Sequence, residues 1–199
     1  NRLYPLSKRM KDINPRRIEQ ALKGMPFVKT AQCYATEDNH VCITITQRTP
    51  IVRVKSFTGE DYYIDDNGGV MPNSQYTSDM IIVTGSVTRP YACRYVYLLA
   101  QELMSDDLWR NQIEQINILP DKTVELVPRV GNHVVNIGAL PSAPPDGTLR
   151  DAVSAFVKKQ MHRLELFYRE GLKYAGWERY DYISLEYSNQ IVCRKREQH

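Results

Sequence analysis

The alternation of apolar and polar residues between Val41 and Pro72 predicts three extended segments in succession. Val41, Ile43 and Ile45 alternate with cysteine and threonine residues, which is the period of a strand with one buried face. Pro50 ends this strand, because proline has no amide hydrogen to donate to a central ladder. A second apolar run begins directly after the proline.

The second run extends from Ile51 to Val54, and a third covers Tyr62 to Ile64. The third run leads into Asp65–Gly68 (DDNG), a cluster that supplies the positive φ of a hairpin turn. The pattern therefore predicts a small sheet followed along the chain by a larger one. We place residues 1–56 in a first unit and residues 57–199 in a second.

Apolar residues at helical spacing, bounded by capping residues, predict three helices. Asn14 caps the first helix, and Thr148 with Asp151 three residues later forms a capping box for the third. Gln160 is the one polar residue in the apolar stripe of the third helix, a position that the edge of a buried face tolerates. The helices run from Pro15 to about Gly24, from about Tyr91 to Ser105 and from Thr148 to about Gly171.

Period-two patterning and turn residues predict further strands on either side of these helices. They are Val28–Tyr34 and Val41–Gln47 in the first unit, then Gln112–Leu119, Thr123–Pro128 and His133–Ile137, and finally Tyr182–Tyr187 and Gln190–Lys195. In the last pair, Ile183, Leu185 and Tyr187 are expected to share a buried face. No strand is expected beyond Gln190–Lys195, so its outer edge should be free.

Three blocks, in order along the chain, carry a family pattern. They are an apolar strand with Arg48 and Pro50 before a Tyr-x-Ile-Asp-x-x-Gly motif at Tyr62–Gly68, then Ile82–Gly85 (IVTG), and then Tyr182–Tyr187 (YISLEY) before Asn189–Val192 (NQIV). Together they resemble the FtsQ/DivIB family of bacterial cell division proteins. The first block is similar to the junction between the POTRA domain and the β domain of that family, and the last is similar to its terminal strand pair.

The resemblance implies an α+β fold. A partial POTRA domain, residues 1–56, would be followed by a mainly antiparallel β domain, residues 57–199, flanked by two helices. A complete POTRA domain has another strand and helix before the first hairpin, and residues 1–13 are too few for both. The first domain is therefore expected to be truncated at its N-terminus.

The same resemblance implies a non-enzymatic scaffold of septal cell-wall synthesis. The chain would lie on the periplasmic side of the inner membrane, anchored by a single span upstream. Family proteins recruit FtsB-like or DivIC-like proteins and FtsL-like proteins through the last strand of the β domain, which accepts a strand from the partner. The match assigns the receiving edge to Gln190, Ile191, Val192, Cys193, Arg194 and Lys195, with Tyr180, Tyr182 and Ser184 on the neighbouring strand.

Charge and hydropathy agree with an extracytoplasmic protein module. The net charge is +3, and the 26 basic residues are spread among 23 acidic ones, whereas a nucleic-acid binder would concentrate its basic residues in a stripe. No apolar run approaches the roughly 20 residues that a membrane span needs. Membrane attachment is thus expected only through an upstream anchor, and no nucleic-acid partner is expected.

The four cysteines do not favour a metal site. Cys33, Cys42, Cys93 and Cys193 lack C-x-x-C spacing and have no histidine at companion distance. Cys33 and Cys42 flank a predicted turn and could form a disulfide across the hairpin. The alternative is four small buried hydrophobic side chains, and the sequence leaves both open.

Motifs that carry a catalytic mechanism are absent. The sequence has no G-x-S-x-G, H-E-x-x-H, G-x-G-x-x-G or Walker loop, and its four histidines, His40, His133, His162 and His199, are scattered. Asp65 and Asp66 lack the alternating oxygens of a calcium loop and suit a hairpin turn better. We therefore expect no enzymatic activity, metal or cofactor.

Two other function classes remain open. POTRA domains also bind unfolded polypeptides by strand addition in outer-membrane protein assembly, and a tandem array or a barrel would favour that interpretation. An unrecognised enzyme would be favoured by a deep pocket that holds two ionisable groups with shifted pKa values.

Overall fold

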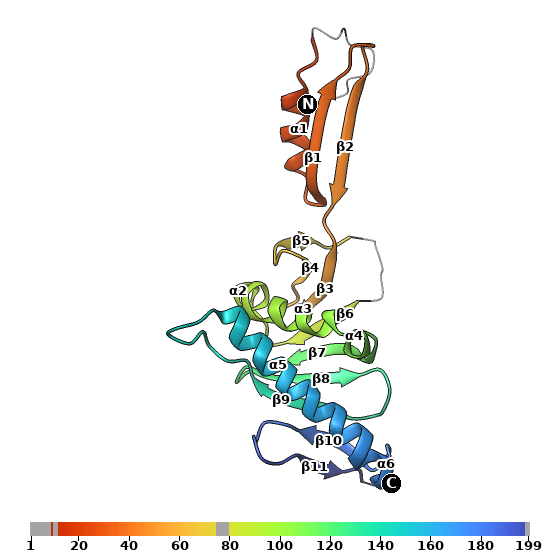
Figure 1. The fold of residues 1–199 in the computed structure, drawn as a ribbon, viewed down its shortest axis with the longest axis vertical. Coiled ribbons are helices and arrows are strands. Elements are labelled where there is room, and N and C mark those ends of the chain that lie inside the picture. Colours follow the sequence, from red (N-terminus) through yellow and green to blue (C-terminus); the bar gives the residue numbers. More distant parts are fainter. Residues whose placement is uncertain (1–8, 10–11, 75–79, 198–199) are drawn as a thin grey trace. The chain divides into compact units, whose positions relative to one another are not determined.

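The computed structural model describes residues 9, 12–74 and 80–197 of the 199-residue chain. Its helices are α1 (Pro15–Lys23), α2 (Arg89–Tyr91), α3 (Tyr97–Ser105), α4 (Asp107–Gln112), α5 (Leu149–Leu166) and α6 (Lys173–Ala175), with π-helical turns over Ala92–Val96 and Phe167–Leu172 (Figure 1). Its strands are β1 (Val28–Ala35), β2 (Val41–Gln47), β3 (Pro50–Ser56), β4 (Asp61–Asp65), β5 (Val70–Pro72), β6 (Ile81–Gly85), β7 (Ile113–Ile118), β8 (Thr123–Pro128), β9 (Val134–Ala139), β10 (Tyr180–Ser184) and β11 (Val192–Lys195).

The chain forms two units, Asn1–Thr49 and Pro50–His199. The sequence analysis assigned residues 50–56 to the first unit, but in the structure they are β3 of the second. The reason is hydrogen bonding: β3 pairs with β4 on one side and with β6 on the other. Pro50 opens this strand at a register shift, a position that tolerates a missing amide.

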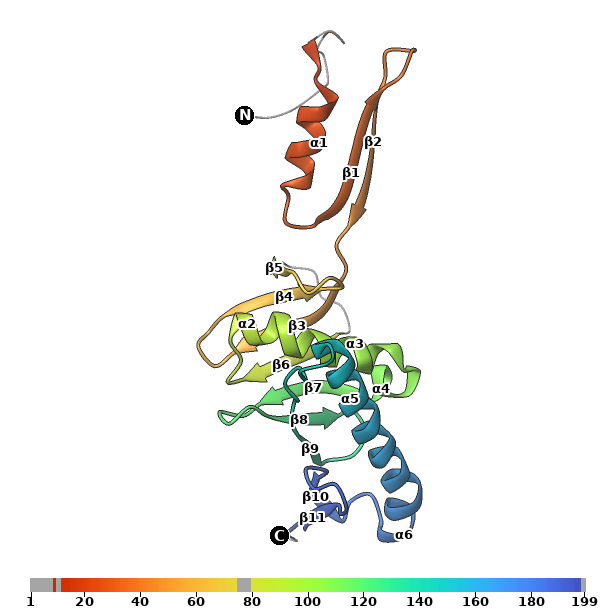
Figure 2. The ribbon, with the colours of Figure 1, turned by 60° about the vertical axis from the view of Figure 1, so that its left-hand side comes forward.

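The first unit consists of α1 packed on the antiparallel hairpin of β1 and β2 (Figure 2). The Asn14 side chain accepts a hydrogen bond from the amide of Arg17 (3.2 Å), which caps the helix as the sequence predicts. Ile18 of α1 and Ala31 of β1 are both buried. Ile45 is paired with Ala31 and therefore shares its face, yet it is exposed.

The hairpin register argues against a disulfide between Cys33 and Cys42. Cys33 is opposite Ile43, and Cys42 is opposite Tyr34. Residues that are directly opposite point to the same face and neighbours along a strand point to opposite faces, so the two cysteine side chains lie on different faces of the hairpin. Both thiols are free.

The second unit is built on a nine-stranded sheet with the order β11-β10-β9-β8-β7-β6-β3-β4-β5. Three neighbouring pairs, β3 with β6, β6 with β7 and β9 with β10, are parallel, and the other described pairs are antiparallel. This mixed sheet with its helices confirms the predicted α+β class. The sequence analysis did not predict the parallel pairs. The connection from β6 to β7 and the connection from β9 to β10 both contain helices, which is the usual form of a crossover between parallel strands.

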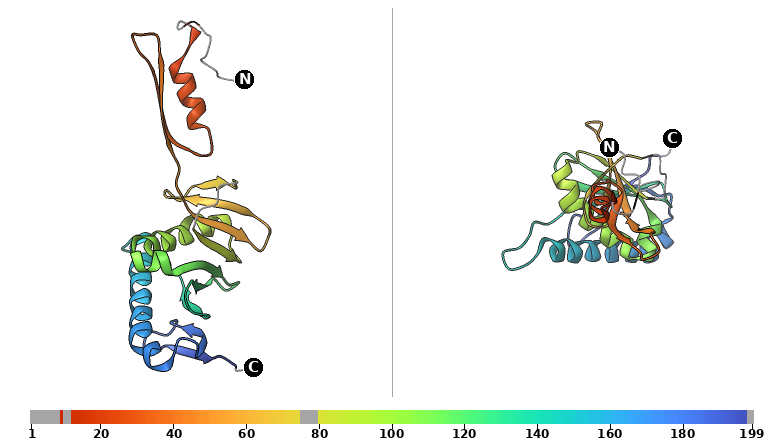
Figure 3. Two further views of the ribbon diagram at one scale, coloured as in Figure 1. Left: turned by 90° about the vertical axis from the view of Figure 1, so that its right-hand side faces the viewer. Right: turned by 90° about the horizontal axis from the view of Figure 1, so that it is seen from above.

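Helices α3 and α5 cover one face of this sheet (Figure 3). Leu99 and Leu103 of α3, and Val157 and Leu164 of α5, are almost completely buried against it. Each such side chain contributes about 1.5–3 kcal/mol through burial. The capping box of α5 forms as predicted, because the amide of Asp151 donates to the hydroxyl of Thr148 (3.1 Å).

The DDNG cluster forms the turn between β4 and β5. A carboxylate oxygen of Asp65 accepts hydrogen bonds from the amides of Asn67 (3.0 Å) and Gly69 (2.7 Å). Gly68 adopts a φ of +79°, which suits glycine. Asp65 therefore organises a hairpin turn, as the sequence indicates.

Gly85 allows the end of β6 to approach β7 closely. Its φ is +90°, and an added Cβ would clash with the backbone oxygen of Ile118 and the side-chain oxygen of Asn117. The next amide, that of Ser86, donates to the same oxygen of Ile118 (2.7 Å). A side chain at position 85 would therefore push apart two strands of the central sheet.

We expect Gly85→Ala to lower the free energy of unfolding of the second unit by about 3 kcal/mol or more, because backbone strain and a steric clash add together. Gly59 is a matched control, since its φ is +85° with no atom within 4 Å of an added Cβ. Gly59→Ala should cost only about 1–2 kcal/mol of backbone strain. Urea unfolding curves of the two variants measure the difference, and equal losses would refute the clash.

Candidate functional site

Strand β11 is the outermost strand of the large sheet, next to β10. Tyr182, Ile183 and Ser184 of β10 pair with β11 on one side and with β9 on the other. No described strand lies beyond β11. The edge that the sequence analysis expected is therefore present, and its use by a partner stays a prediction.

The hydrogen bonds around β10 show which backbone groups of β11 are open. The amide of Arg196 donates to the carbonyl of Arg179 (3.0 Å), and the amide of Leu185 donates to the carbonyl of Asn136 at the end of β9 (2.8 Å). The backbone of Arg196 therefore faces β10. Because backbone groups alternate between the two sides of a strand, those of Arg194 and Val192 also face β10. Those of Cys193 and Lys195 face the open side. A proline at Val192 would therefore disturb the β10–β11 pairing instead of the open edge.

The predicted site residues lie together on β10, on β11 and just before β11, but the strand bounds and the burial differ from the prediction. Gln190 and Ile191 precede β11 instead of belonging to it, and Tyr187 is exposed beyond the end of β10 instead of sharing the buried face. Ser184 is buried. Among the site residues, Tyr180, Tyr182 and Cys193 are half-buried, and Val192, Arg194 and Lys195 are exposed.

Arg194 is paired within the sheet. Its guanidinium donates to a carboxylate oxygen of Asp181 (2.8 Å) and lies over the ring of Tyr182. Asp181 is the extra residue at a register shift in β10, and bulges at sheet edges re-aim side chains in this way. Arg194 lowers the pKa of Asp181 through this hydrogen bond. The positive charge of Arg194 is therefore partly compensated within the sheet.

Cys193 is directed toward the core. It pairs with Ile183, shares the buried face with it and packs against the core of the second unit. Burial raises the pKa of its thiol, which keeps the group protonated and unreactive near neutral pH. Cys193 therefore contributes its backbone to the open edge and its side chain to the core.

Two polar residues of α5, which the sequence analysis did not identify as functional, hold the β10–β11 connection. The buried Gln160 side chain donates to the carbonyls of Ile137 (2.8 Å) and Leu185 (3.1 Å). The guanidinium of Arg163 donates to Leu185 (2.6 Å), and also to the carbonyls of Tyr187 (2.6 Å) and Gln190 (2.9 Å). Arg163 also donates to the side-chain oxygen of Gln160 (2.8 Å). In the sequence, the signal for this role was Gln160 as the one polar residue in the apolar stripe of the helix.

An aromatic cluster lies near the C-terminal end of β11. A ring nitrogen of buried His133 is 2.7 Å from the hydroxyl of Tyr168, whose ring contacts Trp109 and Trp177. The other ring nitrogen of His133, Nδ1, packs against Gly131 and has no hydrogen-bond partner among the described residues. Burial, and secondly the charge of Arg196, lower the pKa of His133.

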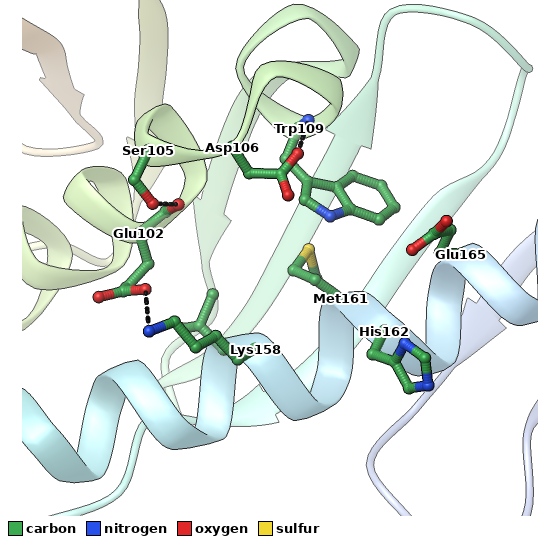
Figure 4. A pocket seen from close by; sticks show the side chains of 9 residues that line it. Glu102, Ser105, Asp106, Trp109, Lys158, Met161, His162 and Glu165 are labelled. Carbon is green, nitrogen blue, oxygen red and sulfur yellow. Dashed lines mark hydrogen bonds and ion pairs between the residues drawn. The ribbon is translucent and has the colours of Figure 1, made fainter.

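A neighbouring hollow lies between α3, α4 and α5 (Figure 4). Trp109 and Met161 face one another across it, and Lys158 forms an ion pair with Glu102 (3.7 Å). Asp106 is the N-cap of α4 and accepts from the amides of Leu108 and Trp109. Within the described ranges, no group of three or more His, Cys, Asp or Glu side chains could hold a metal ion.

Family models match both units of the chain. A family model described as FtsQ/DivIB, C-terminal related, matches residues 49–145 and 148–194, and one described as a POTRA-like domain matches residues 1–46. No curated protein matches the chain. Among solved structures, the major extracytoplasmic domain of the trans isomer of the bacterial division protein DivIB from Geobacillus stearothermophilus is 13% identical, with a TM-score of 0.35 over 59% of this chain and 97% of that one. No helix in the described part of the chain is long and apolar enough to cross a membrane.

Arg163→Met should loosen the edge hairpin while it keeps the apolar stem of the side chain. We expect the free energy of unfolding to fall by about 2 kcal/mol, because the part-buried carbonyl of Leu185 and the more exposed carbonyls of Tyr187 and Gln190 lose a charged donor. Hydrogen exchange should accelerate at residues 185–195. Arg169→Met is the control, since Arg169 is exposed and, among the residues that the structure describes, its side chain pairs with Glu170 alone. This variant should change stability by less than about 0.5 kcal/mol. Equal exchange in both variants would contradict the anchoring role.

The buried His133 should make the second unit less stable in mild acid. Above its ordinary pKa of 6.5 the ring is neutral in both the folded and unfolded states. Below that value the unfolded chain binds a proton that the folded chain does not. The free energy of unfolding therefore decreases by up to about 1.4 kcal/mol as the pH is lowered from roughly 7.5 to 5.5. Denaturant titrations of wild type and His133→Gln should show a smaller loss in the variant; parallel curves would disprove the assignment.

Proposed function

The chain belongs to the FtsQ/DivIB C-terminal-related family of cell division proteins, and we propose that it is a non-enzymatic scaffold that binds a partner by strand addition to β11. The observation that carries this proposal is the open edge of β11, where backbone groups of Cys193 and Lys195 face away from β10. Such groups provide affinity in strand addition, and the side chains of alternate residues provide selectivity.

The other edge of the large sheet is less suited to strand addition. Strand β5 has only three residues and ends at Pro72, which has no amide hydrogen to donate. Short edge strands and prolines are devices that discourage pairing with another chain. The contrast between the two edges supports β11 as the receiving strand.

Lys195 is the basic residue best placed to guide a partner. It makes no ion pair or hydrogen bond through its side chain with any described residue, whereas Arg194 pairs with Asp181 and Arg196 with Glu178. An open charge at an interface rim mainly accelerates association with an oppositely charged segment. We therefore propose a partner segment with an acidic residue beside the added strand.

The partners that this function requires are other membrane proteins of the division apparatus. We propose FtsB-like or DivIC-like and FtsL-like proteins, recruited for septal cell-wall synthesis. The chain would then act on the extracytoplasmic side of a membrane to which a single upstream span anchors it. This role needs neither catalysis, a metal nor a cofactor.

A second candidate function rests on the first unit. Among the described strands, β2 pairs with β1 alone. Ile43 and Ile45 of β2 are exposed, on the same face of the hairpin as the α1 helix that packs on β1. An apolar strand edge of this kind is also suited to receiving an extended polypeptide. This surface supports the polypeptide-binding alternative, as in outer-membrane protein assembly.

Lys195→Pro tests the proposal because it removes one open amide of β11 and leaves the pairing with β10 intact. We expect binding of the extracytoplasmic segment of the FtsB-like or DivIC-like protein from the same organism to weaken at least about tenfold in a calorimetric titration. Lys195→Ala is the matched control; it removes the same side chain but keeps the amide, and should mainly slow association.

Retained affinity in a folded Lys195→Pro variant would refute strand addition at β11. If Ile43→Lys abolished binding while Lys195→Pro did not, the first unit would be the binding surface. Circular dichroism of each variant checks that the fold is kept.

A further inference from the structure

An apolar hollow of about 320 Å³ lies between α4, α5, the β8–β9 turn and the segment before β10. Its outer wall consists of Leu108, Val130 and Trp177, whose side chains are 49%, 60% and 39% exposed. Three large apolar side chains around one concavity are unusual on a surface, where isolated ones are normal. The hollow has the composition of a recognition pocket, with aromatic residues at its centre.

The floor of the hollow is held in place by the aromatic cluster described above. Trp109 is buried, and its ring lies 6.3 Å from that of Tyr168, measured between centroids. The ring of Trp177 lies 5.0 Å from that of Tyr168. Because the hydroxyl of Tyr168 is fixed by His133, the pocket needs little rearrangement to receive a side chain.

Two charged residues, Glu165 and Arg169, line the hollow. Glu165 lines both this hollow and the neighbouring one of about 290 Å³, and its carboxylate makes no ion pair or hydrogen bond with any described residue. Arg169 forms an ion pair with Glu170, and Lys158 of the neighbouring hollow forms one with Glu102, so Glu165 is the lining charge that lacks such a partner among the described residues. Figure 4 shows Glu165 on α5, to the right of Trp109. An open carboxylate beside an apolar pocket favours a basic residue next to an apolar one.

Arg196 links the end of β11 to two segments that line the hollow. The guanidinium of Arg196, one residue past the strand, donates to the carbonyl of Asn132 in the β8–β9 turn and pairs with Glu178 (3.5 Å). Val130 belongs to that turn, and Trp177 precedes Glu178. The outer wall of the hollow therefore lies close to the end of β11, within reach of a partner chain that extends past Lys195.

We propose that the hollow binds a bulky apolar side chain, adjacent to a lysine or arginine that pairs with Glu165, from the same partner segment that adds a strand to β11. This inference rests on the proposed function and extends it. Strand pairing recognises backbone and discriminates weakly, whereas a pocket and a charge select one sequence. The occupant is a division-protein segment that carries both features next to its strand.

The experiment titrates Val130→Asp, Leu108→Asp and Glu165→Lys variants of the full chain with the extracytoplasmic FtsB-like or DivIC-like segment. Each variant should weaken binding about tenfold or more, because a charge in the apolar wall or a reversed rim charge opposes the occupant. Phe57→Asp is the matched control. Phe57 is 74% exposed on the β3–β4 turn of the same unit, away from the hollow, and its substitution should leave the affinity unchanged.

The outcomes separate this inference from the proposed function. If the three hollow variants keep their affinity for the partner segment and Lys195→Pro loses it, binding at the hollow is refuted and strand addition to β11 is supported. If the hollow variants lose affinity and Lys195→Pro keeps it, binding at the hollow is supported and strand addition to β11 is refuted. Failure of the wild-type chain to bind overturns both. Sedimentation of the chain alone that shows a dimer dissociated by Val130→Asp would assign the hollow to a second copy and also overturn the inference.

Discussion

The edge of the large sheet depends on hydrogen bonds that two side chains of α5 donate to backbone carbonyls. Gln160 and Arg163 together satisfy the carbonyls of Ile137, Leu185, Tyr187 and Gln190. Ile137 and Leu185 are buried, and an unsatisfied carbonyl in such a place would cost about 1–3 kcal/mol. The helix that covers the sheet therefore also fixes the position of its outermost strand.

This arrangement explains how an edge strand can be both stable and open. Strand β11 has only four residues, and short strands at an edge are prone to fray. Anchoring its connection to α5 and directing Cys193 into the core hold the strand without a neighbour on its outer side. An edge that is already ordered loses less conformational entropy when a partner strand pairs with it.

The polar and aromatic residues around β11 divide the tasks of recognition. The pair of Asp181 and Arg194 and the bulge between Tyr180 and Tyr182 shape the edge, whereas the open groups of Lys195 remain available to a partner. The aromatic hollow lies past the end of the strand, on the side of the β8–β9 turn. In this division, the backbone supplies general affinity and the hollow supplies discrimination.

The sequence by itself determined the elements whose signals are local. Caps at Asn14 and Thr148, the DDNG turn and period-two patterning predict the ends of helices and the presence of strands, because neighbouring residues decide these features. It also carried the family resemblance, through blocks that lie at the domain junction and the terminal strands. Tertiary structure decided the parallel pairings, the place of residues 50–56, the separation of Cys33 from Cys42, and the anchoring role of Gln160 and Arg163. These features join residues far apart in the chain, and the partner that a strand or polar side chain finds depends on packing that no local pattern records.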